Sequence, residues 1–291
     1  MAATDIERVR MDDLQQENME VIDLTPIVVD EDTALLPDLS GRVKGTVAMS
    51  RALVSASHGL KLNEKRLMMC ALRCIDSKKS PYAHSGSGPG YVSVRVKADQ
   101  FAAVANLQPR AADRQATSAY EGLKDACARL MERTLSYRDG NKLVKLRWVF
   151  KAVYHEGEGW AEIHFSPDLT PHIFMLRNRF VQYNLEFARG LQSVYTWRLL
   201  ELLMREKDRG RLLITVEDLR TALEIPEKYR FADIKRRVIE TAVDELNLKA
   251  DLVVQWKPVK RGRAVASLDF SFIENPQQQL AFSDVGSVLE N

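Results

Sequence analysis

Apolar residues recur at three- and four-residue steps near the C-terminal end of the chain, which predicts one apolar stripe along a helix. The residues of this stripe are Phe231, Ile234, Val238, Ala242 and Leu246. Two strand-like runs follow within Leu252–Ile273, and the turn between them is rich in basic residues. A helix with basic residues off its apolar stripe, backed by a hairpin with a basic tip, is the layout of a winged helix.

The same order of elements is predicted twice along the chain. In the first half it is a helix, a strand, a short helix, a long helix and a hairpin that turns at Glu156–Gly159: Leu62–Cys74, Tyr91–Val96, Asp99–Leu107, Ser118–Thr134 and Leu143–Phe165. In the second half the corresponding segments are Ser193–Glu206, Leu212–Thr215, Val216–Leu223, Phe231–Leu246 and Leu252–Ile273. The closing strands also resemble one another, Ile163-His-Phe-Ser against Leu268-Asp-Phe-Ser. The sequence therefore predicts an α+β fold with two tandem winged-helix domains related by a pseudo-repeat.

The predicted boundaries leave tails at both ends. We expect an acidic disordered tail at residues 1–47, a first winged helix at 48–175, a second at 176–275 and a flexible tail at 276–291. Residues 1–40 contain eleven acidic and two basic side chains, a net charge of −9. An apolar patch in this leader, Val21–Val29, is expected to pack loosely or not at all, with a docking segment as the alternative.

Composition narrows the class of protein. The whole chain carries +2, so the remainder outside the acidic leader carries +11, and a basic body is typical of nucleic-acid binding. A mildly basic protein with a solubilising tail is the alternative. No apolar run of about 18 residues predicts a membrane span, and residues 1–20 are too polar for a signal peptide. The three cysteines are an odd number, which favours a reducing cytoplasm over a disulfide framework.

Basic side chains in two segments of the second half are the candidates for contact with double-stranded DNA. On the helix, or just before it, they are Lys228, Arg230, Lys235, Arg236 and Arg237. On the hairpin they are Lys257, Lys260, Arg261 and Arg263, which are expected to contact phosphate or the minor groove. An arginine fork matches O6 and N7 of guanine, a pairing worth about 1–3 kcal/mol of discrimination. In the alternative, Arg236 and Arg237 merely pair with carboxylates on the helix surface, at Asp233, Glu240 or Asp244.

The first half carries weaker candidates. Arg110 and Arg114 precede its long helix and Lys124 lies along it, while the turn of its hairpin is acidic. We therefore expect the second half to read the DNA sequence, and the first half to contribute backbone contacts or self-association.

Motifs for catalysis and for cofactors are not found in the sequence. There is no Gly-x-x-x-x-Gly-Lys-Ser/Thr phosphate loop, and the histidines are not paired. Cys70 and Cys74 lie one helical turn apart without a second pair, which favours a core position over a zinc site. We expect no enzymatic activity, no cofactor and no small-molecule substrate.

Several motifs of the second half occur in an order that resembles the iteron-binding Rep initiator family of plasmid replication proteins. They are Ser193-x-Tyr195-x-x-Arg198-Leu-x-Glu201, Leu219-Arg220, Tyr229-x-Phe231, Lys235-Arg-x-Val238, Ala242-x-x-Glu245 and Lys260-x-Gly262-Arg263. The first half matches more loosely, through Leu62-x-Glu64-x-Arg66-Leu67. The chain departs from the family at Leu200, where an aromatic residue is common, and in its acidic leader.

The resemblance implies a protein that binds direct repeats at a plasmid origin, helps to open an adjacent AT-rich segment, and recruits the host initiator and the replicative helicase. It implies homodimers, associated through the first domain, that repress the protein's own promoter in the bacterial cytoplasm. It adds Arg198 to the expected DNA contacts, with a structural pairing to Glu201 or Glu224 as the alternative. A dedicated transcriptional repressor on the same scaffold is the alternative function, and a nicking replication enzyme is a third class.

Overall fold

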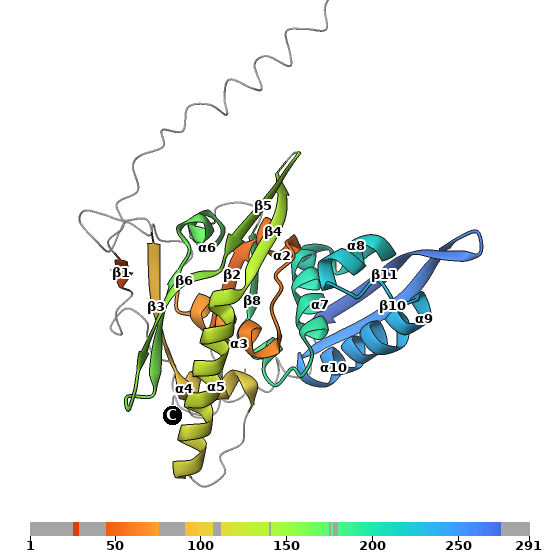
Figure 1. Ribbon diagram of the computed structural model, residues 1–291. Coiled ribbons are helices and arrows are strands. Elements are labelled where there is room, and N and C mark those ends of the chain that lie inside the picture. The colour runs from red at the N-terminus through yellow and green to blue at the C-terminus, as the bar shows by residue number, and fades with distance from the viewer. Residues whose placement is uncertain are drawn as a thin grey trace, which may run out of the picture.

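Two winged helices lie side by side in the computed structural model (Figure 1), which describes residues 26–28, 45–75, 91–106, 112–139, 141–174, 176 and 180–274. We call residues 45–188 the first half and residues 193–274 the second half. The expected α+β fold with two winged helices is confirmed.

The first half contains most of the strands. Its elements are β2 (Thr46–Ser50), α2 (Arg51–Ser55), α3 (Leu62–Arg73), β3 (Tyr91–Lys97), α4 (Ala98–Ala105), α5 (Ala112–Glu132), β4 (Thr134–Asp139), β5 (Lys142–Arg147), β6 (Val149–His155), β7 (Trp160–Phe165), η2 (Pro167–Leu169), α6 (Thr170–Ile173), β8 (Phe180–Asn184) and η3 (Leu185–Ala188). The hydroxyl of Ser50 caps α2 by accepting from the N–H of Leu53.

The second half begins with the helix that packs against both halves. Its elements are α7 (Val194–Arg205), η4 (Lys207–Arg209), β9 (Arg211–Thr215), α8 (Val216–Leu223), α9 (Phe231–Ile234), the π-helical turn η5 (Lys235–Glu240), α10 (Thr241–Lys249), β10 (Leu252–Arg261) and β11 (Ala264–Glu274). Ser193 and Thr215 cap α7 and α8, since their hydroxyls accept from the N–H groups of Tyr195 and Asp218.

The pseudo-repeat is confirmed in the sheet topology. In the first half β7 lies between β3 and β6, and in the second half β11 lies between β9 and β10, with every pair antiparallel. A short helix and a long one separate the first strand from the hairpin in both halves. The matching strand ends bury equivalent side chains, because Phe165 is 1% and Phe270 0% exposed.

One hydrophobic core runs through both halves. Four residues of the predicted stripe, Ile234, Val238, Ala242 and Leu246, are buried in it, and Phe231 packs at its margin. Cys70 is also buried in the core, where burial raises the pKa of its thiol to about 12.

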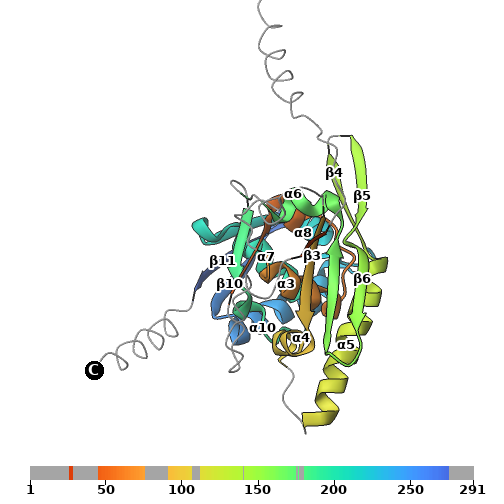
Figure 2. The same cartoon turned by 90° about the vertical axis from the view of Figure 1, so that its left-hand side faces the viewer.

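A hairpin in the first half was not predicted. The structure confirms the turn at residues 156–159, but residues 143–147 pair with β4 and not with the strands of the predicted hairpin. Residues 143–155 contain no Gly, Pro, Asn, Asp or Ser, so the sequence carries no turn signal at the break. The break lies at Trp148, which is fully buried and donates from its indole N–H to the carbonyl oxygen of His58 (3.1 Å). The β4–β5 hairpin projects from the body of the first half (Figures 1 and 2).

The structure differs from the predicted domain boundaries in the leader and between the two winged helices. Pro26–Val28, within the apolar patch of the leader, form strand β1, which pairs in parallel with β3. The first winged helix also begins before the predicted residue 48, since β2 starts at Thr46. Strand β8, which the expected boundary assigns to the second domain, pairs with β2 of the first half. The rest of both tails lies outside the described residues.

We predict a large stability difference between two leucines of α10. Leu246 is 0% exposed and Leu248 is 80% exposed. Leu246→Ala should lower the free energy of unfolding by about 2–5 kcal/mol, because it removes buried methyl groups and leaves a cavity. The matched control Leu248→Ala should change it by less than about 0.5 kcal/mol. Urea unfolding followed by circular dichroism measures both, and equal losses would contradict the placement of this helix.

Candidate nucleic-acid interface

Arg220 holds the turn that leads into the basic helix, the name used here for residues 231–249. From α8 its Nη1 donates to the carbonyl oxygen of Pro226 (3.4 Å) and its Nη2 donates to that of Tyr229. The N–H of Arg230 then bonds to the carboxylate of Asp233 (3.3 Å), where the helix begins. Arg220 therefore positions the start of the basic helix. No pattern in the sequence predicts this role, because contacts six and nine residues away follow no periodicity.

The three central basic residues lie on a widened helical turn. Lys235, Arg236 and Arg237 fall within the π-helical segment η5, and all three side chains are exposed. The hydroxyl of Thr241 donates to the carbonyl oxygen of Arg236, five residues earlier (3.1 Å). In an α-helix, successive side chains are about 100° apart around the axis. The π turn changes that rotation locally, and such turns are frequent at functional sites.

The expected alternative, in which Arg236 and Arg237 pair with carboxylates on the helix surface, is correct for Arg237, and Lys235 is also paired. Nε of Arg237 lies 3.6 Å from Asp233 Oδ1, and its guanidinium lies over the ring of Tyr229, 5.5 Å from the centroid. Lys235 Nζ lies 3.5 Å from Glu240 Oε1. Exposed pairs of this kind contribute little and exchange readily. Both cations therefore stay available to a partner.

Arg236 differs from its neighbours. Its side chain is exposed and makes no hydrogen bond or ion pair with the described part of the chain. Lys228 and Arg230, which precede the helix, are also exposed.

The basic hairpin, β10 with β11, carries the second group. Gly262 adopts φ +65° at the turn, and no atom lies within 4 Å of the position that a Cβ would take there. Lys260, Arg261 and Arg263 flank it as exposed side chains, and none pairs with a carboxylate in the residues that the structure covers. Lys257 is different, because its Nζ lies 3.5 Å from Asp269 Oδ2.

The two groups lie at one end of the second half. Figure 1 shows α9, the first turn of the basic helix, at the same end as the tip of the β10–β11 hairpin. The arrangement places several exposed cations at the same end of the second half. Their contact with DNA stays a prediction.

The weaker candidates of the first half have a different setting. Lys124 Nζ lies 2.8 Å from Glu156 Oε1, so the acidic hairpin turn neutralises it in part. This carboxylate raises the pKa of Lys124. Arg114 lies in α5, and Arg110 lies outside the described residues.

The chain matches two family models over most of the described fold. Residues 46–204 match the model described as initiator replication protein, WH1, and residues 215–272 match the model described as initiator Rep protein, WH2. The chain belongs to the initiator replication protein family. The matched ranges of this initiator divide between residues 204 and 215.

Two relatives are similar over most of the initiator's length. A replication initiation protein of Escherichia coli is 24% identical over 247 residues, which are 80% of this chain and 71% of the relative. The crystal structure of the Pi initiator protein in complex with iteron DNA shares the fold with a TM-score of 0.64 at 21% identity, covering 80% of this chain and 98% of that one. Among the described helices of the initiator, none is long and apolar enough to cross a membrane.

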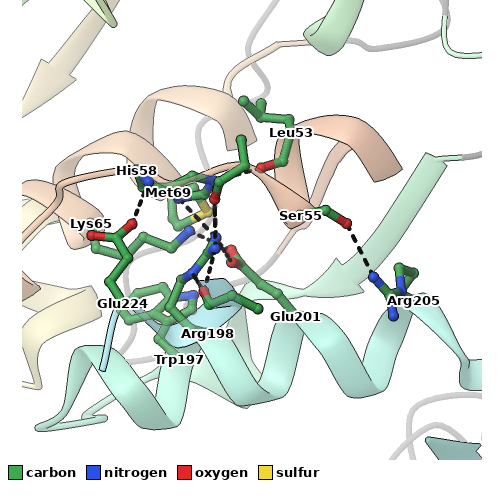
Figure 3. A network of polar contacts seen from close by, with 12 residues as sticks. Leu53, Ser55, His58, Lys65, Met69, Trp197, Arg198, Glu201, Arg205 and Glu224 are labelled. Atoms are coloured by element: carbon green, nitrogen blue, oxygen red, sulfur yellow. Dashed lines mark hydrogen bonds and ion pairs between the residues drawn. The ribbon is translucent and has the colours of Figure 1, made fainter. Parts of the chain in front are cut away.

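The expected DNA contact at Arg198 is wrong. Arg198 is only 3% exposed and points from α7 toward the segment that carries His58 (Figure 3). Its guanidinium donates to the carbonyl oxygens of Ala222 (2.6 and 2.9 Å) and Ala56 (2.7 Å), and Nη1 lies 3.6 Å from Glu201 Oε2. The structural alternative is correct for Glu201. A buried guanidinium with these partners cannot reach a duplex.

The charges around Arg198 are compensated within the initiator. Lys65 and Glu201, both fully buried, form an ion pair with Nζ 2.6 Å from Oε1. Burial lowers the pKa of Lys65 to about 8, although Glu201 acts in the opposite direction. Burial, followed by the charges of Arg198 and Lys65, holds the pKa of His58 well below its usual range, so the ring is neutral. A neutral ring nitrogen accepts from Arg198 Nη1, which lies about 3 Å away.

We predict that Arg198→Ala lowers the free energy of unfolding and removes no contact with DNA. Removing one partner of a buried charge network typically costs about 3–5 kcal/mol, because the remaining charge and the carbonyls lose their partner. Arg209→Ala is the matched control, since that side chain is 79% exposed and pairs only with Glu206. The control should change the free energy of unfolding by less than about 1 kcal/mol. Chemical denaturation measures both, and an unchanged stability for Arg198→Ala would contradict the burial.

Proposed function

We propose that this initiator binds double-stranded origin DNA at directly repeated sequences, iterons. The basic helix enters the major groove, and the basic hairpin contacts the neighbouring backbone or minor groove. One observation carries the proposal: Arg236, Lys260, Arg261 and Arg263 are exposed at one end of the second half and have no carboxylate partner among the described residues. Phosphate oxygens and guanine edges supply the acceptors that such groups lack.

The opposite end of the second half offers a contrast. There Lys207 pairs with Glu274 at 2.6 Å, and Arg209 pairs with Glu206 at 3.1 Å. Midway along β11, Arg211 donates two hydrogen bonds to Asp269, at 2.7 and 2.9 Å, and Asp269 also pairs with Lys257. The unpaired positive charge is therefore concentrated where a duplex would lie, and this supports binding at that end.

The similar fold of the Pi initiator protein, which was crystallised with iteron DNA, supports the same target. The first half contributes backbone contacts and self-association, and homodimers formed through it repress the protein's own promoter. Bound protomers help to open an AT-rich segment and recruit the host initiator and the replicative helicase. Unstacking costs a few kcal/mol per step, which several bound protomers can offset without a catalytic step or a cofactor. This function places the protein on DNA in the bacterial cytoplasm.

Footprinting on the DNA that flanks the gene tests the proposed target. We expect protection of several direct repeats, at spacings of whole helical turns, beside an AT-rich segment. Protection of one inverted repeat at the gene's own promoter and nowhere else would instead indicate a dedicated repressor. Strand cleavage of supercoiled origin DNA in the presence of Mg²⁺ would indicate a nicking enzyme.

We predict that two substitutions separate base reading from backbone attraction. Arg236→Ala should weaken binding to the correct repeat by about 1–3 kcal/mol and relax discrimination at one base pair of the repeat. Lys260→Ala should weaken binding to every sequence alike. It should also reduce the slope of log K against log salt concentration by about one. Fluorescence anisotropy on a panel of mismatched repeats, at several salt concentrations, distinguishes the two. Arg209→Ala, at the opposite end, is the control and should bind like the unmodified protein. Equal losses on all sequences for Arg236→Ala would rule out its base-reading role.

A further inference from the structure

The interface between the two halves repeats itself with approximate two-fold symmetry. Arg66 and Arg198 are each the fifth residue of the first long helix of their winged helix, α3 and α7. Arg198 donates to Ala56 O (2.7 Å), in the segment before α3. Arg66 donates to Leu191 O (2.8 Å), in the segment before α7. Each arginine therefore ties its own helix to the chain that leads into the other one.

The ends of the two short helices make a second reciprocal pair of contacts. Both α4 and α8 end in a left-handed residue, Asn106 with φ 53° and Glu224 with φ 54°. Asn106 packs against Gly190, before α7, where an added Cβ would lie 3.2 Å from the Cβ of Asn106. Glu224 reaches the segment before α3: its carboxylate accepts from the N–H of Gly59 (3.1 Å to both oxygens) and from that of His58.

Glu224 is an unusual residue for its backbone conformation. A left-handed residue at the end of a helix is most often glycine and sometimes asparagine, because a Cβ is unfavourable there. Asn106 follows this rule and Glu224 does not. The carboxylate bridge to the first half accounts for a glutamate at a position whose backbone favours glycine.

Apolar packing does not close the interface beside this bridge. A cavity of about 220 Å³ lies there, lined among others by Lys61, Tyr195 and Glu224. Side chains do not fill this edge of the interface between the halves. At this edge, the angle between the two halves therefore depends on the hydrogen bonds of the Glu224 carboxylate.

We propose that Glu224 is a positioning residue that clamps the two winged helices at the angle at which both address one DNA repeat. The proposal rests on the proposed function, in which both halves contact the same duplex. Two modules held rigidly at the spacing of their sites bind the second site at a high effective concentration, and a loose connection lowers it. The clamp therefore contributes affinity for a full site without touching DNA.

Glu224→Gly tests the clamp directly, because it removes the carboxylate and leaves a residue that suits the left-handed backbone. Asp251→Gly is the matched control: Asp251 has φ 51° and lies in the same half, without a hydrogen bond to the first half among the described contacts. The full chain is used throughout. The first measurement is hydrogen exchange at the amides of His58 and Gly59, without DNA. The second is affinity for a duplex with one footprinted repeat, and for a shortened duplex that lacks the base pairs under the first half.

Glu224→Gly should speed exchange at both amides by tenfold or more and weaken binding to the intact repeat by about tenfold. Its affinity for the shortened duplex should match that of the unmodified protein, and Asp251→Gly should change none of these quantities. Unchanged exchange would overturn the clamp, and so would faster exchange with unchanged affinity for the intact repeat. If the unmodified protein binds both duplexes equally, contact by both halves fails, whereas the exchange result still shows whether the clamp exists.

Discussion

The burial of one guanidinium, that of Arg198, constrains how the two winged helices sit against each other. A buried charge is tolerated only when its donors find acceptors in good geometry. Arg198 finds them on both sides, at Ala56 in the first half and at Ala222 in the second (Figure 3). These hydrogen bonds tolerate little displacement, because they weaken steeply away from good geometry. The orientation of the halves is therefore specified by polar satisfaction as well as by apolar burial.

The neighbours of Arg198 complete the same network. Glu201 lies between Lys65 and Arg198, and it also accepts from the hydroxyl of Tyr183 (3.3 Å). The indole of Trp197 donates to that hydroxyl in turn (3.0 Å). Chains of buried hydrogen bonds reinforce one another and leave few alternative arrangements. The network thus explains why polar residues occupy the centre of an interface that is otherwise apolar.

The two halves show how one architecture can carry different chemistry. Both present a long helix beside a hairpin, with the same strand order in the sheet. In the first half the hairpin turn is acidic, and Glu156 neutralises the lysine nearest to it. In the second half Lys260, Arg261 and Arg263 surround the turn and remain exposed. The charge of the exposed turn therefore differs between the halves through side chains on a common scaffold.

The sequence alone determined the features that depend on local periodicity and on charge. The apolar stripe of the basic helix, the repeated order of elements, the basic tip at Gly262 and the acidic turn at Glu156 were all readable, because each involves residues close together in the chain. The tertiary structure decided the rest. Arg198 and Arg236 are both arginines on helices, yet one is buried between the halves and the other is exposed. The bond of Glu224 to Gly59 joins residues 165 positions apart, and the break between β5 and β6 depends on the bond of Trp148 to His58, 90 positions away. Such contacts follow no local spacing, and only the folded chain brings their atoms together.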